Sequence, residues 1–119
     1  GVANNGTTPD GKVTLEHIEC NAACDYAPVM MVNWEFFDNQ TPESAKELVD
    51  QLRAGTPPAP TRGATLRTHV ETSRILAGFP DGAVGEGPSA GPASLVGVEL
   101  AKQRHEQAPA IVHQREGEQ

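Results

Sequence analysis

The sequence of 119 residues predicts an α/β fold in its first half and a long extended C-terminal tail in its second. In residues 1–55, short runs that alternate between apolar and polar positions are followed by one amphipathic helix pattern. Residues 56–119 are rich in glycine and proline, and Phe79 is their single aromatic residue. We therefore expect a folded domain that ends at Gly55, followed by a tail that packs on partners or stays disordered.

The composition excludes several classes of protein. The net charge of −7 argues against a dedicated nucleic-acid-binding protein, which would present a basic face. No apolar run approaches the roughly 20 residues of a membrane span. The two cysteines, Cys20 and Cys24, lie too close in sequence to form a secreted disulfide framework.

The first expected elements lead to the cysteines. Residues 1–11 are turn-forming, with Asn-Gly and Pro-Asp-Gly sequences. Residues 13–19 alternate and include Val, Thr and Ile, which predicts a strand that ends at Cys20. Residues 20–25 then predict a loop that begins at Cys20, continues through small residues to Cys24 and ends at Asp25.

A hairpin and a helix are expected next. Residues 29–32 and 34–37 predict two strands joined by a tight turn at Asn33, which makes three strands in all. A helix is predicted within residues 38–55. Its signals are a threonine N-cap, a proline at the first helical position, an apolar stripe and a closing glycine: Thr41, Pro42, Ala45, Leu48, Val49, Leu52 and Gly55.

The tail offers weaker signals. Three prolines in residues 56–60 predict an extended segment. Residues 66–76 have apolar positions at mixed spacing, and residues 78–91 have the composition of a linker. Residues 95–105 predict a short strand or a helix, and the pattern does not decide between the two.

Cys20 and Cys24 form the one cluster of reactive groups, and four interpretations compete. A disulfide would close a small, strained ring. Sites of thiol redox catalysis favour a Cys-x-x-Cys motif at a helix N-terminus, with two residues between the cysteines. Three residues separate Cys20 from Cys24. A third interpretation is a pair of buried cysteines without a role. The fourth interpretation is ligation of an iron–sulfur cluster or zinc, which a loop of small residues with backbone N–H groups aimed at the sulfurs would suit.

Either metal centre needs four ligands, and the cysteines supply two. His17 is better explained as a strand side chain than as a ligand, and Asp25 as a loop acid. The other histidines lie in the tail without a partner at ligand spacing: His69, His105 and His113. The residues alone therefore define half of a metal site.

The order of motifs resembles a known family. A Thr-Thr-x-Asp-Gly turn begins at Thr7, Glu-Cys-x-x-x-Cys-Asp-x-Ala-Pro spans residues 19–28, and Thr-Pro-Glu starts the helix at Thr41. Over residues 1–55 the sequence is similar to the C-terminal part of the thioredoxin-like [2Fe–2S] ferredoxin subunit of bacterial NADH:quinone oxidoreductase (complex I).

The resemblance implies a thioredoxin-like [2Fe–2S] ferredoxin half-domain: strand, cysteine loop, hairpin and helix. It implies that Cys20 and Cys24 are two of the four ligands of a [2Fe–2S] cluster. The other two are expected upstream of Gly1, in line with the missing initiator methionine, which indicates a processed chain or one cut from a longer protein. No catalytic residue is implied in this chain, which would act as a subunit of the enzyme without a complete active site.

The implied function is one-electron exchange with the flavin of a neighbouring subunit. The expected partners are the flavin-bearing subunit, which holds FMN and binds NADH, and the large iron–sulfur subunit. The expected place is the peripheral arm of the complex, on the cytoplasmic side of the bacterial inner membrane. Alternatives are the equivalent diaphorase subunit of a hydrogenase or formate dehydrogenase, a thiol oxidoreductase, and a cluster-free assembly module.

Overall fold

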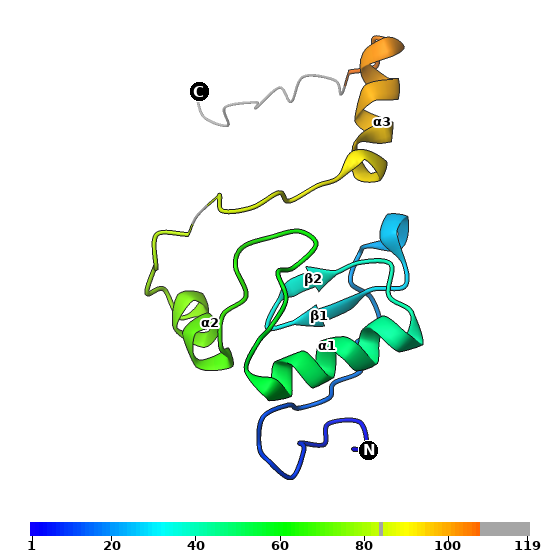
Figure 1. Ribbon diagram of the computed structural model, residues 1–119. Coiled ribbons are helices and arrows are strands. Elements are labelled where there is room, and N and C mark those ends of the chain that lie inside the picture. The colour runs from blue at the N-terminus through cyan, green and yellow to red at the C-terminus, as the bar shows by residue number, and fades with distance from the viewer. Residues whose placement is uncertain (84, 108–119) are drawn as a thin grey trace, which may run out of the picture.

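The computed structural model describes residues 1–83 and 85–107, and within them it confirms an α/β fold. The elements in chain order are a short 3-10 helix η1 (Cys24–Tyr26), strands β1 (Met30–Val32) and β2 (Glu35–Phe37), and helices α1 (Pro42–Ala54), α2 (His69–Leu76) and α3 (Pro92–Gln103). Helix α1 runs along the hairpin, whereas α2 and α3 stand on other sides of it (Figure 1).

The predicted hairpin is confirmed, with each strand one residue shorter than predicted. Strands β1 and β2 are antiparallel, and Met30 lies opposite Phe37. Both residues of the turn have positive φ, 47° at Asn33 and 75° at Trp34. A two-residue hairpin turn with this backbone matches the right-handed twist of the strands. Trp34 therefore belongs to the turn rather than to the second strand.

The strand predicted at residues 13–19 is wrong. Thr14 makes a single antiparallel bridge with Thr7, and their hydroxyls lie 2.9 Å apart. Beyond it, Leu15 and Ile18 are each 47% exposed. Residues 5–8 run beside residues 13–15, where the Leu15 N–H donates to the Gly6 carbonyl at 2.9 Å, but in the described ranges no strand pairs with residues 16–19. A strand needs a neighbouring strand along its whole length, because its backbone N–H and C=O groups form hydrogen bonds to that neighbour and not within the strand itself. The described residues therefore form two strands and not three.

The helix is confirmed in detail. Thr41 caps α1 by accepting a hydrogen bond from the Ser44 backbone N–H at 3.1 Å, and the Ser44 hydroxyl accepts one from the Thr41 N–H at 2.9 Å. Pro42 occupies the first turn, and Gly55 ends the helix with φ of 77°. Leu48 is buried, in the middle of the predicted apolar stripe.

The N-terminal loop is fastened to the end of α1. The Lys12 ammonium donates to the Arg53 carbonyl at 2.6 Å, and Arg53 Nε lies 2.8 Å from Asp10 Oδ2. A hydrogen bond from the Thr8 hydroxyl, followed by the one from Arg53, lowers the pKa of Asp10 to about 2. The carboxylate is thus ionised at neutral pH and holds the loop against the helix.

The core is small. Among the residues described, the buried hydrophobic ones are Ala23, Phe37 and Leu48. The cysteine loop, the hairpin and α1 contribute one of these residues each. The cysteine loop is therefore part of the folded unit.

The tail is not extended throughout. It first passes beside the hairpin, where the Thr61 N–H donates to the Phe36 carbonyl at 2.8 Å and Arg62 bridges Phe36. The structure then adds α2, which the mixed spacing of residues 66–76 did not reveal. For residues 95–105, where the sequence left strand and helix open, the structure has a helix, α3. No residue of α2 or α3 is buried. Local capping rather than a core explains α2, since Thr68 and Glu71 form a capping box at its start.

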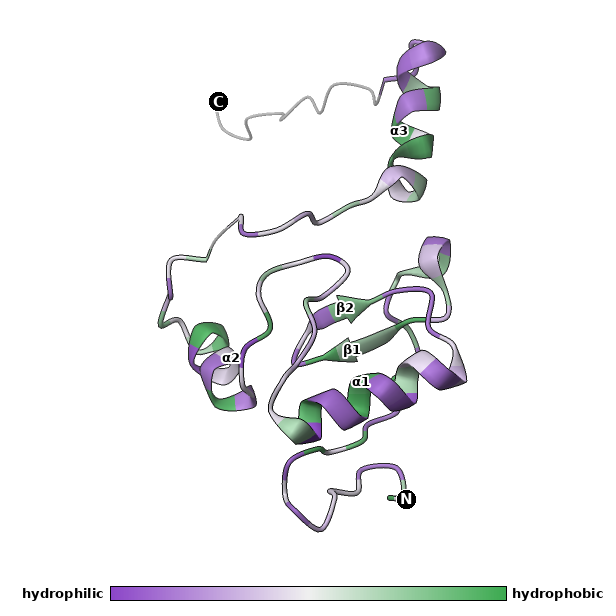
Figure 2. Cartoon of the chain, in the orientation of Figure 1, coloured by the Kyte–Doolittle hydropathy of each residue, from purple (hydrophilic) through white to green (hydrophobic). Residues whose placement is uncertain are grey.

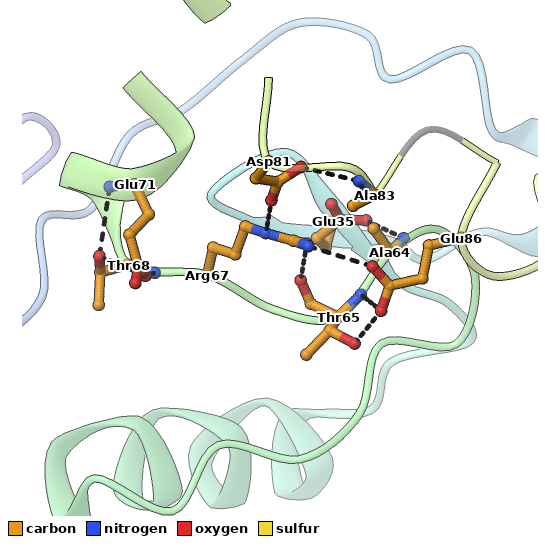
Figure 3. A network of polar contacts seen from close by, with 9 residues as sticks. All are labelled: Glu35, Ala64, Thr65, Arg67, Thr68, Glu71, Asp81, Ala83 and Glu86. Atoms are coloured by element: carbon orange, nitrogen blue, oxygen red, sulfur yellow. Dashed lines mark hydrogen bonds and ion pairs between the residues drawn. The ribbon is translucent and has the colours of Figure 1, made fainter. Parts of the chain in front are cut away.

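Asp81 and Glu86 lie against the segment between the hairpin and α2 (Figure 3). Arg67 is the centre of this network: it pairs with Asp81 and, at 3.1 Å, with Glu86. The Glu86 carboxylate also accepts from the Thr65 hydroxyl and backbone N–H, and the hydroxyl is the main reason why the pKa of Glu86 is lowered. These ion pairs hold the glycine-rich linker beside residues 63–68.

Candidate metal centre

The two cysteines lie on one exposed loop. Cys20 precedes the loop's tightest part, and Cys24 is the first residue of η1. Both are free thiols that face solvent. The disulfide interpretation and the interpretation as two buried, inert cysteines therefore do not describe this structure. Two solvent-facing thiols separated by three residues are available to a metal.

Ala22 and Ala23, between the cysteines, differ in backbone conformation and burial. Ala22 adopts φ of 50°, which reverses the chain, and its N–H donates to Cys20 Sγ at 3.3 Å. Ala23 is 5% exposed and fixes the loop to the core. The Tyr26 N–H donates to the Ala23 carbonyl at 3.1 Å and closes the turn that carries Cys24. The predicted backbone donor to a sulfur is thus present at Ala22.

The other candidate ligands do not gather at the cysteines. His17 is exposed, and its backbone N–H donates to Asn4 Oδ1 at 2.8 Å. His69 begins α2, His105 follows α3, and His113 lies outside the described residues. Residues 1–83 and 85–107 contain no group of three or more His, Cys, Asp or Glu side chains that could hold a metal ion.

Asp25 behaves as the loop acid that its position predicted. Its carboxylate accepts a hydrogen bond from the Ser94 hydroxyl at the start of α3. It therefore connects the cysteine loop to the tail. This connection links residues 69 positions apart, and no sequence pattern in either segment pointed to it.

This loop would supply two of the four ligands of a four-thiolate cluster. The donors are thiols, which suit iron–sulfur chemistry, and the alanine side chains leave room for close approach of a group to the backbone. The Ala22 N–H stabilises negative charge on the Cys20 sulfur. Two further ligands are needed, and the described residues do not place any near the two cysteines.

Sequence reasoning missed Arg62. Its guanidinium lies over the Tyr26 ring, two residues after Cys24, and over the Phe36 ring. A lone cation after a proline-rich segment gives no periodic signal, and its contact with the cysteine loop depends on the path of the tail.

Residues 1–53 match the family described as thioredoxin-like [2Fe–2S] ferredoxin. The match includes both cysteines, the hairpin and nearly all of α1. The matched segment contains the three buried hydrophobic residues of the described chain, one each from the cysteine loop, the hairpin and α1.

Similar proteins match either most of the chain or about half of it. The E subunit of the NADH-quinone oxidoreductase of Mycobacterium tuberculosis is 64% identical over 110 residues, which are 92% of this chain and 44% of that protein. The mitochondrial NADH dehydrogenase [ubiquinone] flavoprotein 2 of Dictyostelium discoideum is 40% identical over 57 residues, 48% of this chain and 23% of that protein. The E subunit from Rickettsia bellii is 38% identical over 53 residues, 44% of this chain and 32% of that protein. The chain thus spans less than half the length of these relatives.

Proposed function

We propose that this chain is part of an electron-transfer subunit of an NADH-quinone oxidoreductase. Cys20 and Cys24 would be two of the four thiolate ligands of its [2Fe–2S] cluster. When bound, the cluster supplies one-electron redox chemistry. The observation that carries the proposal is the pair of exposed, free thiols on a loop anchored in the core of a ferredoxin-family segment.

The residues of the loop would set the environment of the thiolates. The Ala22 N–H donates to the Cys20 sulfur at 3.3 Å and would donate to the same sulfur as a cluster ligand. Asp25, next to Cys24, adds negative charge, as does the net −6 of residues 1–53, which have nine acidic and three basic residues. Negative charge nearby disfavours an added electron, so we expect a low reduction potential.

The partners would be the flavin-bearing, NADH-binding subunit, which holds FMN, and the large iron–sulfur subunit. The peripheral arm on the cytoplasmic side of the bacterial inner membrane would be the location. Apolar side chains on α3 favour a partner contact (Figure 2): Leu95, Val96, Val98 and Leu100 are each more than 40% exposed. No helix in the described part of the chain is long and apolar enough to span a membrane.

The first test is the visible absorption spectrum and iron content of the full-length subunit after its flavin-bearing and iron–sulfur partner chains have been removed. We expect two iron atoms and two acid-labile sulfides per subunit, with visible absorption that is partly bleached on reduction. A colourless preparation without iron would contradict the proposal. The sequences of the co-purified chains would separate a complex I from a hydrogenase or formate dehydrogenase that carries an equivalent diaphorase subunit.

A cluster-free assembly module is the second candidate function. It is favoured by the presence of only two thiol donors in the described chain and by the exposed apolar residues of α3. It predicts that replacing both cysteines with serine leaves the complex assembled and fully active. The electron-transfer proposal predicts that this double variant loses the cluster and the electron-transfer activity, even if the complex still assembles.

A further inference from the structure

The Tyr26 ring, at the end of the turn that begins with Cys24, is held by a residue of the tail. The Arg62 guanidinium carbon lies 5.3 Å from the centre of the Tyr26 ring and 4.2 Å from the centre of the Phe36 ring. A guanidinium over aromatic faces is attracted by the rings' negative faces, and more so where water is excluded. Arg62 therefore joins the cysteine turn to strand β2.

Arg62 is itself fixed in place. Its Nε lies 3.1 Å from Asp38 Oδ2, and its Nη2 donates to Asp38 Oδ1 at 3.2 Å. The two side chains are only 12% and 8% exposed. The Thr61 hydroxyl donates to the same carboxylate at 2.9 Å and accepts from the Asp38 N–H at 3.0 Å. A paired and mostly buried guanidinium of this kind has a single orientation, so it can define the position of the ring above it.

The other end of Tyr26 is held by the start of α3. The Tyr26 hydroxyl accepts a hydrogen bond from the Ala93 N–H at 3.1 Å, next to the contact between Ser94 and Asp25. Gly91 lies so close that a Cβ at this position would overlap the Tyr26 hydroxyl. The tail thus contacts the cysteine turn at two places far apart in sequence, residue 62 and residues 91–94.

We propose that the tail is a clamp that positions the Cys24 thiolate for ligation, with Arg62 as its main positioning residue. Both contact points lie outside residues 1–53, the segment that matches the ferredoxin family. The ligation part of this inference rests on the proposed function. The clamp fixes Tyr26 by its ring and by its hydroxyl, and Tyr26 is the last residue of the turn whose first residue is Cys24.

Amide hydrogen exchange in the full chain tests whether the clamp exists. The amides of Tyr26 and Asn39 report on it, since Tyr26 donates to Ala23 and Asn39 donates to the Tyr26 carbonyl at 2.9 Å. We expect Arg62→Leu to speed both exchange rates by at least about tenfold, because it removes the desolvated cation–π contact and also leaves the mostly buried Asp38 carboxylate without its partner. Arg74→Leu is the matched control, because Arg74 lies over the ring of Phe79, at 5.0 Å, after α2 and away from the turn.

Cadmium binding tests whether the clamp positions the thiolate. The probe is Cd²⁺ alone, titrated into the reduced full chain and followed by its thiolate charge-transfer absorption. We expect Arg62→Leu to weaken Cd²⁺ binding by about tenfold, in proportion to the exchange effect. Arg62→Lys should recover part of the affinity by keeping the ion pair without the planar stack. Arg74→Leu should bind as the unmodified chain does.

A milder variant keeps the test decisive if Arg62→Leu does not fold. Tyr26→Phe keeps the ring on Arg62 and removes only the acceptor for Ala93, and we expect about a threefold loss of Cd²⁺ affinity, as for one neutral hydrogen bond.

The outcomes separate the two proposals. Unchanged exchange in Arg62→Leu would overturn the clamp. Faster exchange with unchanged Cd²⁺ affinity would overturn the positioning role, as would Cd²⁺ binding no tighter than that of a Cys20→Ser/Cys24→Ser variant. If Cd²⁺ binding follows the prediction but the isolated subunit never carries iron, the clamp stands and the electron-transfer proposal fails.

Discussion

The two alanines between the cysteines predict opposite effects of the same substitution. Ala22 is exposed and adopts φ of 50°, in the left-handed region. Ala23 is 5% exposed and has an ordinary φ of −125°. Glycine relieves backbone strain at the first position and removes a buried methyl group at the second. Ala22→Gly and Ala23→Gly therefore form a matched pair within the cysteine loop.

The magnitudes follow from these surroundings. The left-handed conformation costs an alanine roughly 1 kcal/mol, and the greater freedom of glycine in the unfolded chain costs roughly 0.7 kcal/mol. Ala22→Gly should thus be slightly stabilising, by about 0.3 kcal/mol. Ala23→Gly loses about 0.8 kcal/mol of methyl burial besides the same 0.7 kcal/mol, so it should destabilise by about 1.5 kcal/mol.

Urea unfolding followed by far-ultraviolet circular dichroism measures the difference. With a denaturant slope of about 2 kcal/mol/M, the midpoints of the two variants should differ by roughly 1 M urea. The unmodified chain should fall close to Ala22→Gly. Equal losses of stability in both variants would refute the assignment of Ala22 to a strained exposed position and of Ala23 to the core.

Three further predictions concern the core, pH and charge. Leu48→Ala should lower the free energy of unfolding by about 3 kcal/mol in a denaturant titration, whereas Leu95→Ala, on an exposed face, should change it by less than about 1 kcal/mol. The pKa of Asp10 is lowered to about 2, so its stabilisation is present above its ordinary value of 3.8 and is lost as the pH falls toward 2. Asp10→Asn should flatten the fall in melting temperature over that range, and an unchanged slope would count against the link. Asp25→Lys should raise the reduction potential of the cluster by roughly 40 mV, equivalent to about 1 kcal/mol for one electron, while the remote Asp50→Lys should shift it less.

The hairpin and α1 could be predicted from sequence because their signals are local. Asn33 adopts the positive φ of the tight turn, and the cap and stop of α1 are set by Thr41 and Gly55. Each signal needs only neighbours within a few residues. The prediction failed at residues 13–19, where alternation was present but pairing depends on a second strand. Leu15 is left 47% exposed as a result.

The candidate site could be predicted only in its chemistry. Cys20 and Cys24 were recognisable from residue type, spacing and the surrounding motif, and the structure shows them free and exposed. The contact of Arg62 with Tyr26 could not be predicted, because it depends on how the tail returns across β2. Nor could the contact of Ser94 with Asp25, since an isolated serine at a helix start is ordinary capping chemistry.

The most direct test of the central claim is the electron paramagnetic resonance spectrum of the reduced complex. The variants are Cys20→Ala and Cys24→Ala in the intact subunit, with His17→Ala as the control in the same segment. We expect each cysteine variant to lose the [2Fe–2S] signal of this subunit, while the histidine variant keeps it at full intensity. A [2Fe–2S] signal that survives unchanged in both cysteine variants would contradict the claim that these two thiolates hold the cluster.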